Sequence, residues 1–192
     1  MIKYIAYYII TFIILISFPV NTPAQIEIST IEELQKIGND LSYPLDGDYV
    51  LINNIDASGT RNWNDGKGFE PIAEQYNHFT GSFDGANYVI EGLYIYRPEQ
   101  NYIGLFVSVN GATIENIIMN NVSIYGGYST GALSGRGSNF SNCKISGVVK
   151  GADKTGGIAG DGRKIEDCSF FFFFSGNNDV GGLVGSGGNI TD

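Results

Sequence analysis

The sequence predicts an all-β fold, a right-handed parallel β-helix (a solenoid) with a short capping helix at its N-terminal end. A Gly-rich apolar motif recurs along the second half of the chain, and a second row of apolar residues keeps the same period. The composition is poor in charge and rich in glycine, polar turn-forming residues and aromatic residues, which favours strands and turns over helices.

The recurring motif places one large apolar residue among small ones. The central residues are spaced by 28, 25 and 25 positions: Leu105, Leu133, Ile158 and Leu183. The second row is spaced by 26, 25 and 25 positions: Ile114, Phe140, Ile165 and Ile190. Because both rows share one period, we expect each repeat to be one coil stacked on the previous coil, with each row forming an inward-facing column.

The length of the repeat favours a β-helix over other repeat folds. About 25 residues at roughly 3.3 Å each give a path of about 80 Å, which matches one lap of a three-sided coil. A propeller blade takes roughly 40–45 residues, and the leucine-rich repeat signature is missing.

The glycines of the motif are predicted to be structural residues. We expect them at corners of the coil, where a positive φ or a close backbone contact excludes a side chain. Gly157 and Gly182 hold equivalent positions in consecutive repeats, and both should be intolerant of a side chain. The predicted structural glycines are Gly104, Gly131, Gly135, Gly156, Gly157, Gly160, Gly181, Gly182 and Gly185.

The chain divides into three parts by composition. Residues 1–24 have Lys3 followed by an apolar stretch and small residues, which predicts a cleaved signal peptide, with an uncleaved membrane anchor as the alternative. Residues 25–100 are predicted to form the N-terminal cap and the first coils. Residues 101–192 hold the repeats and stop within one, so we expect a truncated last coil and a fragment of a longer protein.

The segment from Ile26 to Leu41 has a helical period. Ser29 or Thr30 can cap the start, with Glu32 or Glu33 three residues further on. The residues expected on its buried face are Ile31, Leu34, Ile37 and Leu41. Such a helix would cover the open first coil.

The charge and the titratable residues do not indicate an active site. The net charge of −9 argues against binding nucleic acid or anionic lipid through a basic patch. A carbohydrate-cleaving pair or a calcium site could be built from carboxylates, but turn chemistry is the favoured role for Asp56 and Asp84. The carboxylates considered are Asp56, Asp65, Glu70, Asp84 and Glu91, and the single histidine is His78. We therefore predict no catalytic residue, no metal and no cofactor.

Cys143 and Cys168 are one period apart and should lie on adjacent coils. Neighbouring strands are about 4.8 Å apart, which a disulfide tolerates. The alternative is two buried thiols packed as small apolar residues, because in-register side chains of a parallel sheet point the same way and do not assure an unstrained bridge.

Five consecutive phenylalanines occupy residues 170–174. Because alternate residues of a strand point in and out, some of these rings must face outward. They predict either an aromatic surface that binds glycan or a partner, or a hydrophobic side covered by chain beyond this sequence.

The repeats resemble the GLUG motif of bacterial secreted and cell-surface proteins. Residues 182–185 match Gly-Leu-aliphatic-Gly in full, residues 157–160 match with Ile158 in place of leucine, and residues 79–85 and 90–95 resemble the lead-in to such repeats. The resemblance covers roughly residues 26–192. It implies an extracellular β-rich module without a defined reaction.

The resemblance also sets the expected function. Adhesin-like proteins carry these repeats, so it implies a non-catalytic adhesion module or structural stalk, secreted or at the cell surface. The implied partners are a glycan or a host or cell-surface protein, with no nucleic acid and with membrane contact only through an uncleaved signal segment. The repeats also occur beside immunoglobulin A1-cleaving metallopeptidase domains, whose H-E-x-x-H helix is missing here. A β-helix carbohydrate-active enzyme fragment and an accessory region of a surface metallopeptidase stay as alternatives.

Overall fold

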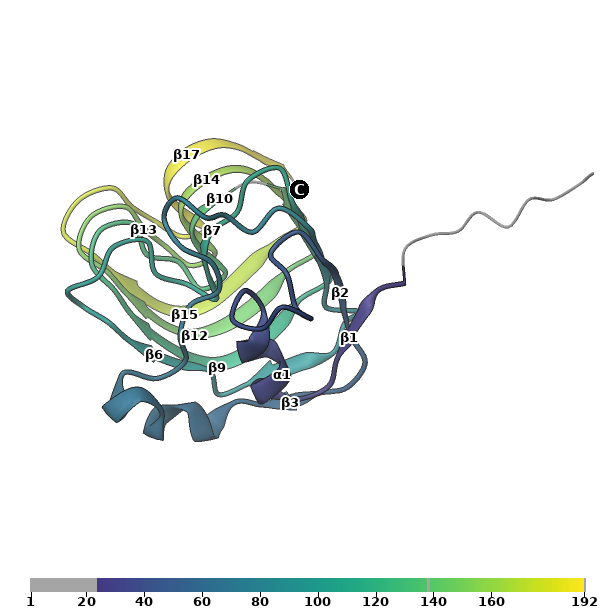
Figure 1. Ribbon diagram of the computed structural model, residues 1–192. Coiled ribbons are helices and arrows are strands. Elements are labelled where there is room, and N and C mark those ends of the chain that lie inside the picture. The colour runs from purple at the N-terminus through teal and green to yellow at the C-terminus, as the bar shows by residue number, and fades with distance from the viewer. Residues whose placement is uncertain (1–23, 138, 192) are drawn as a thin grey trace, which may run out of the picture.

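The computed structural model describes residues 24–137 and 139–191, so the predicted signal segment lies outside the described residues except for Ala24. Its strands are parallel and form a β-solenoid of about six turns with almost no helix (Figure 1). The predicted fold class is confirmed.

Three parallel sheets form the walls of the solenoid. The first sheet has nine strands. Eight of them are neighbours in the order β1 (Ile26–Ile28), β2 (Asp48–Leu51), β4 (Ser82–Asp84), β8 (Thr113–Glu115), β11 (Phe140–Ser141), β14 (Ala159–Glu166), β10 (Ser134–Gly137) and β7 (Phe106–Ser108). The ninth, β17 (Val184–Thr191), pairs with β14. The second sheet has six strands. Five of them are neighbours in the order β15 (Ser169–Ser175), β12 (Lys144–Lys150), β9 (Ile118–Tyr125), β5 (Val89–Glu91) and β3 (Ile55–Asp56). The sixth, β6 (Tyr94–Tyr96), pairs with β9. The third pairs β13 (Thr155–Gly156) with β16 (Val180–Gly181).

The register of the strands places the periodic residues on top of one another. Ile114, Phe140, Ile165 and Ile190 are successive Cα partners. The other row is joined by backbone bonds, with Leu133 N–H donating to Ile158 O at 2.9 Å and Ile158 N–H to Leu183 O at 2.8 Å. The inner members of both rows are fully buried, which is the inward packing that the period predicts.

The last coil differs from the inner coils. Leu183 is only partly buried, and the side chain of Ile190 is 49% exposed. Both residues lie on the outermost coil, where neighbouring residues pack on one side only. Both residues keep their places in the predicted columns, and their lower burial comes from their position on the outermost coil.

Eight of the nine motif glycines, all except Gly182, are required by close backbone contact and not by a left-handed conformation. None of the nine has a φ in the left-handed region. A Cβ on Gly131 would lie 2.6 Å from Ile158 O, and one on Gly104 would lie 2.7 Å from Gly131 O. Positive φ values fall instead on other residues at corners one period apart, as at Ser129 (62°), Lys154 (51°) and Asp179 (49°).

The N-terminal segment forms a strand and a short helix instead of one long helix. Ile26–Ile28 is β1, because it pairs in register with β2. Helix α1 (Ile31–Lys36) is capped at its N-terminus by Thr30, whose Oγ1 accepts the Glu33 N–H at 3.2 Å. The N–H and hydroxyl of Ser29 donate to the Glu33 carboxylate and lower the pKa of Glu33.

Helix α1 packs onto the interior at the N-terminal end of the solenoid (Figure 1). Ile31, Leu34 and Ile37 are buried as expected. Leu41 is fully exposed, so its predicted place on the buried face is wrong. The helix ends at Lys36 and Gly38 takes a left-handed φ of 79°, which breaks the helical period before Leu41.

We expect Gly157→Ala to destabilise the protein and the equivalent change in the next coil, Gly182→Ala, to be nearly neutral. A Cβ on Gly157 would lie 2.5 Å from Gly182 O, whereas one on Gly182 meets no atom within 4 Å, which corrects the prediction that both positions exclude a side chain. The first variant should lose about 1–3 kcal/mol of unfolding free energy through overpacking. Urea denaturation followed by circular dichroism measures both, and equal midpoints would contradict the stacking argument.

Candidate binding surface

An aromatic row crosses the outside of the six-stranded sheet. It consists of Tyr94 and Tyr96 on β6, Tyr125 on β9, Lys150 on β12 and Phe173 on β15. The row faces outward because the residues next to its members on the same strands point inward and are fully buried: Ile95, Ile124 and Val149. In-register pairing of the strands then brings residues that are far apart in sequence into one continuous surface.

The rings of the aromatic row are in contact. The centroids of Tyr94 and Tyr96 are 6.4 Å apart with an interplanar angle of 8°, and Tyr96 is 5.4 Å from Tyr125. Lys150 Nζ lies 5.6 Å from the ring centroids of both Tyr125 and Phe173, so it joins the two aromatic parts by cation–π contact. Tyr96 is 45% and Phe173 is 53% exposed, so the row presents apolar faces to solvent beside polar groups.

A groove of about 610 Å³ adjoins the tyrosine end of the row. Its lining includes the aromatic residues Tyr94 and Tyr96 and the charged residues Asp65, Lys67 and Glu99. Asp65 and Gly66 of the short 3-10 helix η2 (Asn64–Gly66) line it, together with residues 97–100. Its size falls within the range of small-molecule sites, about 300–1,000 Å³. Aromatic surface with charged and amide groups around it suits a ligand that is part apolar and part hydroxylated.

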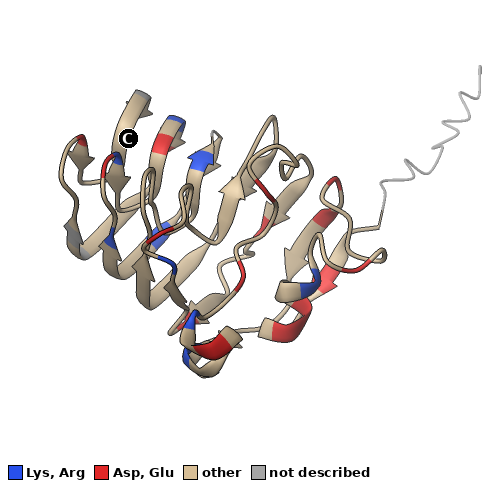
Figure 2. Ribbon diagram, turned by 60° about the vertical axis from the view of Figure 1, so that its left-hand side comes forward, with Lys and Arg blue, Asp and Glu red and all other residues tan. Residues whose placement is uncertain are grey.

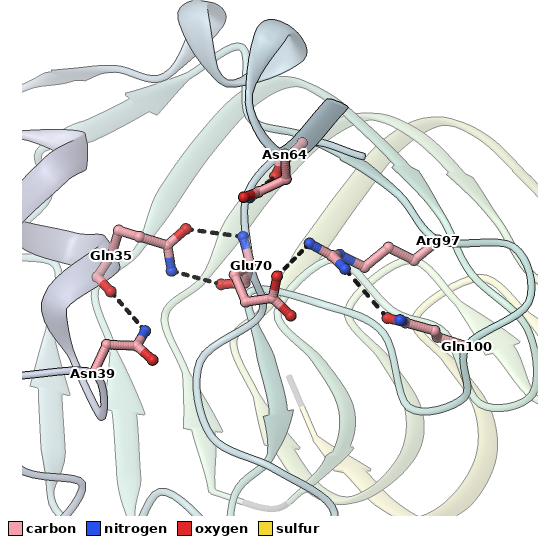
Figure 3. Close-up of polar contacts among 7 residues, drawn as sticks. Gln35, Asn39, Asn64, Glu70, Arg97 and Gln100 are labelled. Carbon is pink, nitrogen blue, oxygen red and sulfur yellow. Dashed lines mark hydrogen bonds and ion pairs between the residues drawn. The ribbon is translucent and has the colours of Figure 1, made fainter. Parts of the chain in front are cut away.

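An ion pair fixes the wall of this groove (Figure 3). The Arg97 guanidinium is almost fully buried and pairs with the Glu70 carboxylate, while its Nη1 lies 3.5 Å from Gln100 Oε1. The Arg97 N–H also donates to Tyr125 O at 2.8 Å. These contacts hold the segment from Arg97 to Gln100 against the six-stranded sheet, next to the aromatic row.

The same carboxylate-bearing residue connects the groove to the N-terminal cap. The side-chain amide of Gln35 makes two 2.9 Å bonds with the backbone of Glu70, accepting its N–H and donating to its carbonyl (Figure 3). Asn39 Nδ2 donates to Gln35 O at 2.9 Å. Helix α1 is thereby joined to the groove wall through Glu70, which gives this carboxylate a structural role.

Among the other carboxylates considered from sequence, Asp56 and Glu91 are Cα partners on the neighbouring strands β3 and β5, and Glu91 accepts a hydrogen bond from Asn121 Nδ2. Asp56 and Asp84 bond to turns. Asp56 Oδ1 accepts the Ser58 N–H at 2.9 Å, and hydrogen bonds from the Ser58 hydroxyl and N–H lower the pKa of Asp56. Asp84 Oδ1 accepts the Ala86 N–H at 2.8 Å and Asn116 Nδ2 at 2.9 Å. These are the turn contacts expected of aspartate beside small residues. Asp65 lines the groove. Within residues 24–137 and 139–191, no three His, Cys, Asp or Glu side chains are grouped to hold a metal ion.

The two cysteines lie on adjacent coils and are free thiols, so the disulfide alternative is not formed in the structure. The Cys143 N–H donates to Cys168 Sγ at 3.3 Å. Hydrogen bonding from the Cys143 side chain and N–H lowers the pKa of Cys168. The same thiol contact together with burial raises the pKa of Cys143.

One end of the aromatic row was predicted from the sequence, and the other end was not. Outward-facing rings were predicted in residues 170–174, and Phe171 and Phe173 are 65% and 53% exposed. The tyrosines were not singled out, because Tyr94 and Tyr96 lie before the regular repeats. A signal was present, since Tyr96, Tyr125 and Lys150 are spaced by 29 and 25 positions, close to one period.

A parallel solenoid with an exposed aromatic surface defines a repeat module, and two relatives indicate its setting. The chain is 37% identical to halomucin of Haloquadratum walsbyi over 134 residues, which is 67% of this chain and 1% of halomucin. It is 41% identical over 78 residues to a protein named as a Gly-rich membrane protein of Evansella cellulosilytica, which is 36% of this chain and 9% of that protein. The chain thus spans a small part of either relative.

No family model matches the chain, and no solved structure matches it. The fold and the relatives together fit a structural protein of the cell surface or the exterior. Across the described residues, no helix is both long and apolar enough to span a membrane.

We expect Cys168 to react with iodoacetamide faster than Cys143 at pH 7.5. Cys168 is only partly buried and has the lowered pKa, so it supplies more accessible thiolate. Mass spectrometry of peptides from timed labelling measures both rates. The Cys143→Ser variant controls for the effect of the neighbouring thiol, and faster labelling of Cys143 in the unmodified chain would contradict the expectation.

Proposed function

We propose that this chain is a non-catalytic repeat module of a secreted or cell-surface protein, of the GLUG-repeat kind, and that it adheres to neutral glycan through the aromatic row. The observation that carries the proposal is the row itself, five outward-facing side chains on four parallel strands beside a polar groove. The relatives support the extracellular setting, since one is a halomucin and the other is named as a membrane protein.

The chemistry of the row suits sugar rings. A pyranose has a face of C–H groups that stacks on aromatic rings and an edge of hydroxyls that needs hydrogen bonds. Tyr96 supplies exposed aromatic surface beside the nearly parallel ring of Tyr94, over which the Arg61 guanidinium lies at 4.3 Å, and both phenol groups are polar. Lys67, Glu99 and Gln100 supply donors and acceptors along the groove.

A structural stalk is the second role that this module can fill, and a host or cell-surface protein is a second class of partner. The stacked coils support the stalk role, because each coil binds its neighbours through a continuous set of backbone bonds. A stalk needs no exposed aromatic row, so loss of binding upon mutation of the row separates the two roles.

An enzyme is the competing class, either a carbohydrate-active β-helix enzyme or an accessory region of a metallopeptidase. Asp65 and Glu99 both line the groove, which is the feature of this chain that favours glycan cleavage. We propose that they bind and do not catalyse. Reducing-sugar release from the oligosaccharides tested below should stay at background, and turnover that Glu99→Gln abolishes would replace adhesion with hydrolysis.

We expect Tyr96→Ala to weaken binding of neutral oligosaccharides about tenfold, which corresponds to losing one aromatic contact of roughly 1.4 kcal/mol. The probes are gluco-, xylo-, manno- and N-acetylglucosamine hexasaccharides, measured by isothermal titration calorimetry with the full chain. Tyr76→Ala is the matched control, because Tyr76 is exposed and lies outside the aromatic row. Equal affinity of the two variants, or no binding of any probe, would sink the adhesion proposal.

A further inference from the structure

The negative charge of this protein is concentrated in its first coils. Residues 24–100 contain 13 acidic and 4 basic residues, whereas residues 101–192 contain 7 acidic and 6 basic residues. Figure 2 shows Asp and Glu gathered over the N-terminal part and Lys and Arg recurring on later coils. A chain that is acidic as a whole therefore has near-neutral C-terminal coils, where a local basic site is not opposed by the bulk charge.

A polar pocket of about 140 Å³, partly open to solvent, lies on these later coils. It is lined by residues of four successive coils, among them His78, Ser108, Arg136, Asp161 and Arg163. Ser108, Arg136 and Asp161 are Cα partners on β7, β10 and β14, so the strand register builds the pocket. Its lining is mainly polar, and its volume has room for a small polyatomic anion.

The basic groups of the pocket have no internal partner among the described residues. Neither Arg136 nor Arg163 makes a side-chain hydrogen bond or ion pair with any described residue, and both are exposed. Asp161, the acidic residue of the lining, is paired with Lys154 at 3.5 Å. His78 Nδ1 is buried without a hydrogen-bond partner in the described chain. A buried polar atom and two guanidinium groups without a hydrogen-bond partner thus line one pocket, and its one carboxylate, Asp161, is paired with Lys154.

We propose that this pocket binds one oxyanion, a sulfate or a carboxylate group, either free or carried on a polysaccharide. The planar guanidinium forks of Arg136 and Arg163 bind oxygen pairs by bidentate hydrogen bonds. His78 adds a ring nitrogen on the same anion, as donor in the tautomer that carries the proton on Nδ1. The site is separate from the aromatic row, because none of its lining residues belongs to the row.

Calorimetric titration of the full chain at constant ionic strength tests the proposal. The probes are sodium sulfate, sodium glucuronate, a galacturonic acid hexamer and a sulfated galactose hexamer. Arg136→Gln and Arg163→Gln should each weaken binding about tenfold, the loss expected when a charge-assisted hydrogen bond is removed. Lys164→Gln is the matched control, since it removes the same charge from the next position of β14, where Lys164 pairs with Glu166 at 3.1 Å.

The outcomes separate the source of the anion and can overturn the site. Equal affinity for sulfate and for the hexamers, lost in both arginine variants, assigns the pocket to a free anion. At least tenfold tighter binding of a hexamer, lost in the same variants, assigns it to a polysaccharide group. Equal weakening in Lys164→Gln and Arg163→Gln, or no binding of any probe, would overturn the proposal. Unchanged melting temperatures exclude misfolding as the cause, and Tyr96→Ala should bind these anions normally, which separates this site from the aromatic row.

Discussion

The parallel backbone hydrogen bonds between successive coils are the interaction on which the rest of the structure depends. They require the coils to approach to the spacing of neighbouring strands, about 4.8 Å, at every point of the lap. At the Gly-rich corner this leaves no room for a Cβ, as the contact of Gly131 with Ile158 O on the next coil shows. The same bonds set the register, and the register decides which side chains share a column inside and which share a row outside.

The fold could be predicted from sequence because a solenoid shows its geometry as a period. Leu133 and Ile158, or Phe140 and Ile165, identify the inward columns without any knowledge of local propensity. The N-terminal segment does not repeat, and its structure was harder to predict from sequence. Residues 26–28 pair with a strand about twenty positions away, and this tertiary pairing outweighs the local helical period. The reason given for the glycines was incomplete as well, since left-handed corners are taken by residues such as Lys154 and Asp179.

The binding surfaces were less accessible to sequence reasoning, because they depend on register between residues that no motif connects. Phe173 was found through an unusual run of one residue type, whereas Tyr96 and Arg136 are ordinary residues until the neighbouring coils are aligned. His78 lies before the regular repeats, and it lines the pocket only because the coils stack on one another. Periodicity predicts the inside of a solenoid, where one residue type repeats, better than its outside, where each coil contributes a different side chain.

Because the inner coils share one period and one register, only certain insertions and deletions preserve the fold during evolution. Gain or loss of a whole period joins equivalent corners, so the chain becomes longer or shorter by one strand spacing while every remaining residue keeps its partner. Gain or loss of a single residue within β12 or β14 moves each following side chain to the opposite face of the wall. Length therefore varies in whole coils, and an aromatic or basic row on the outside is extended or shortened by one member at a time.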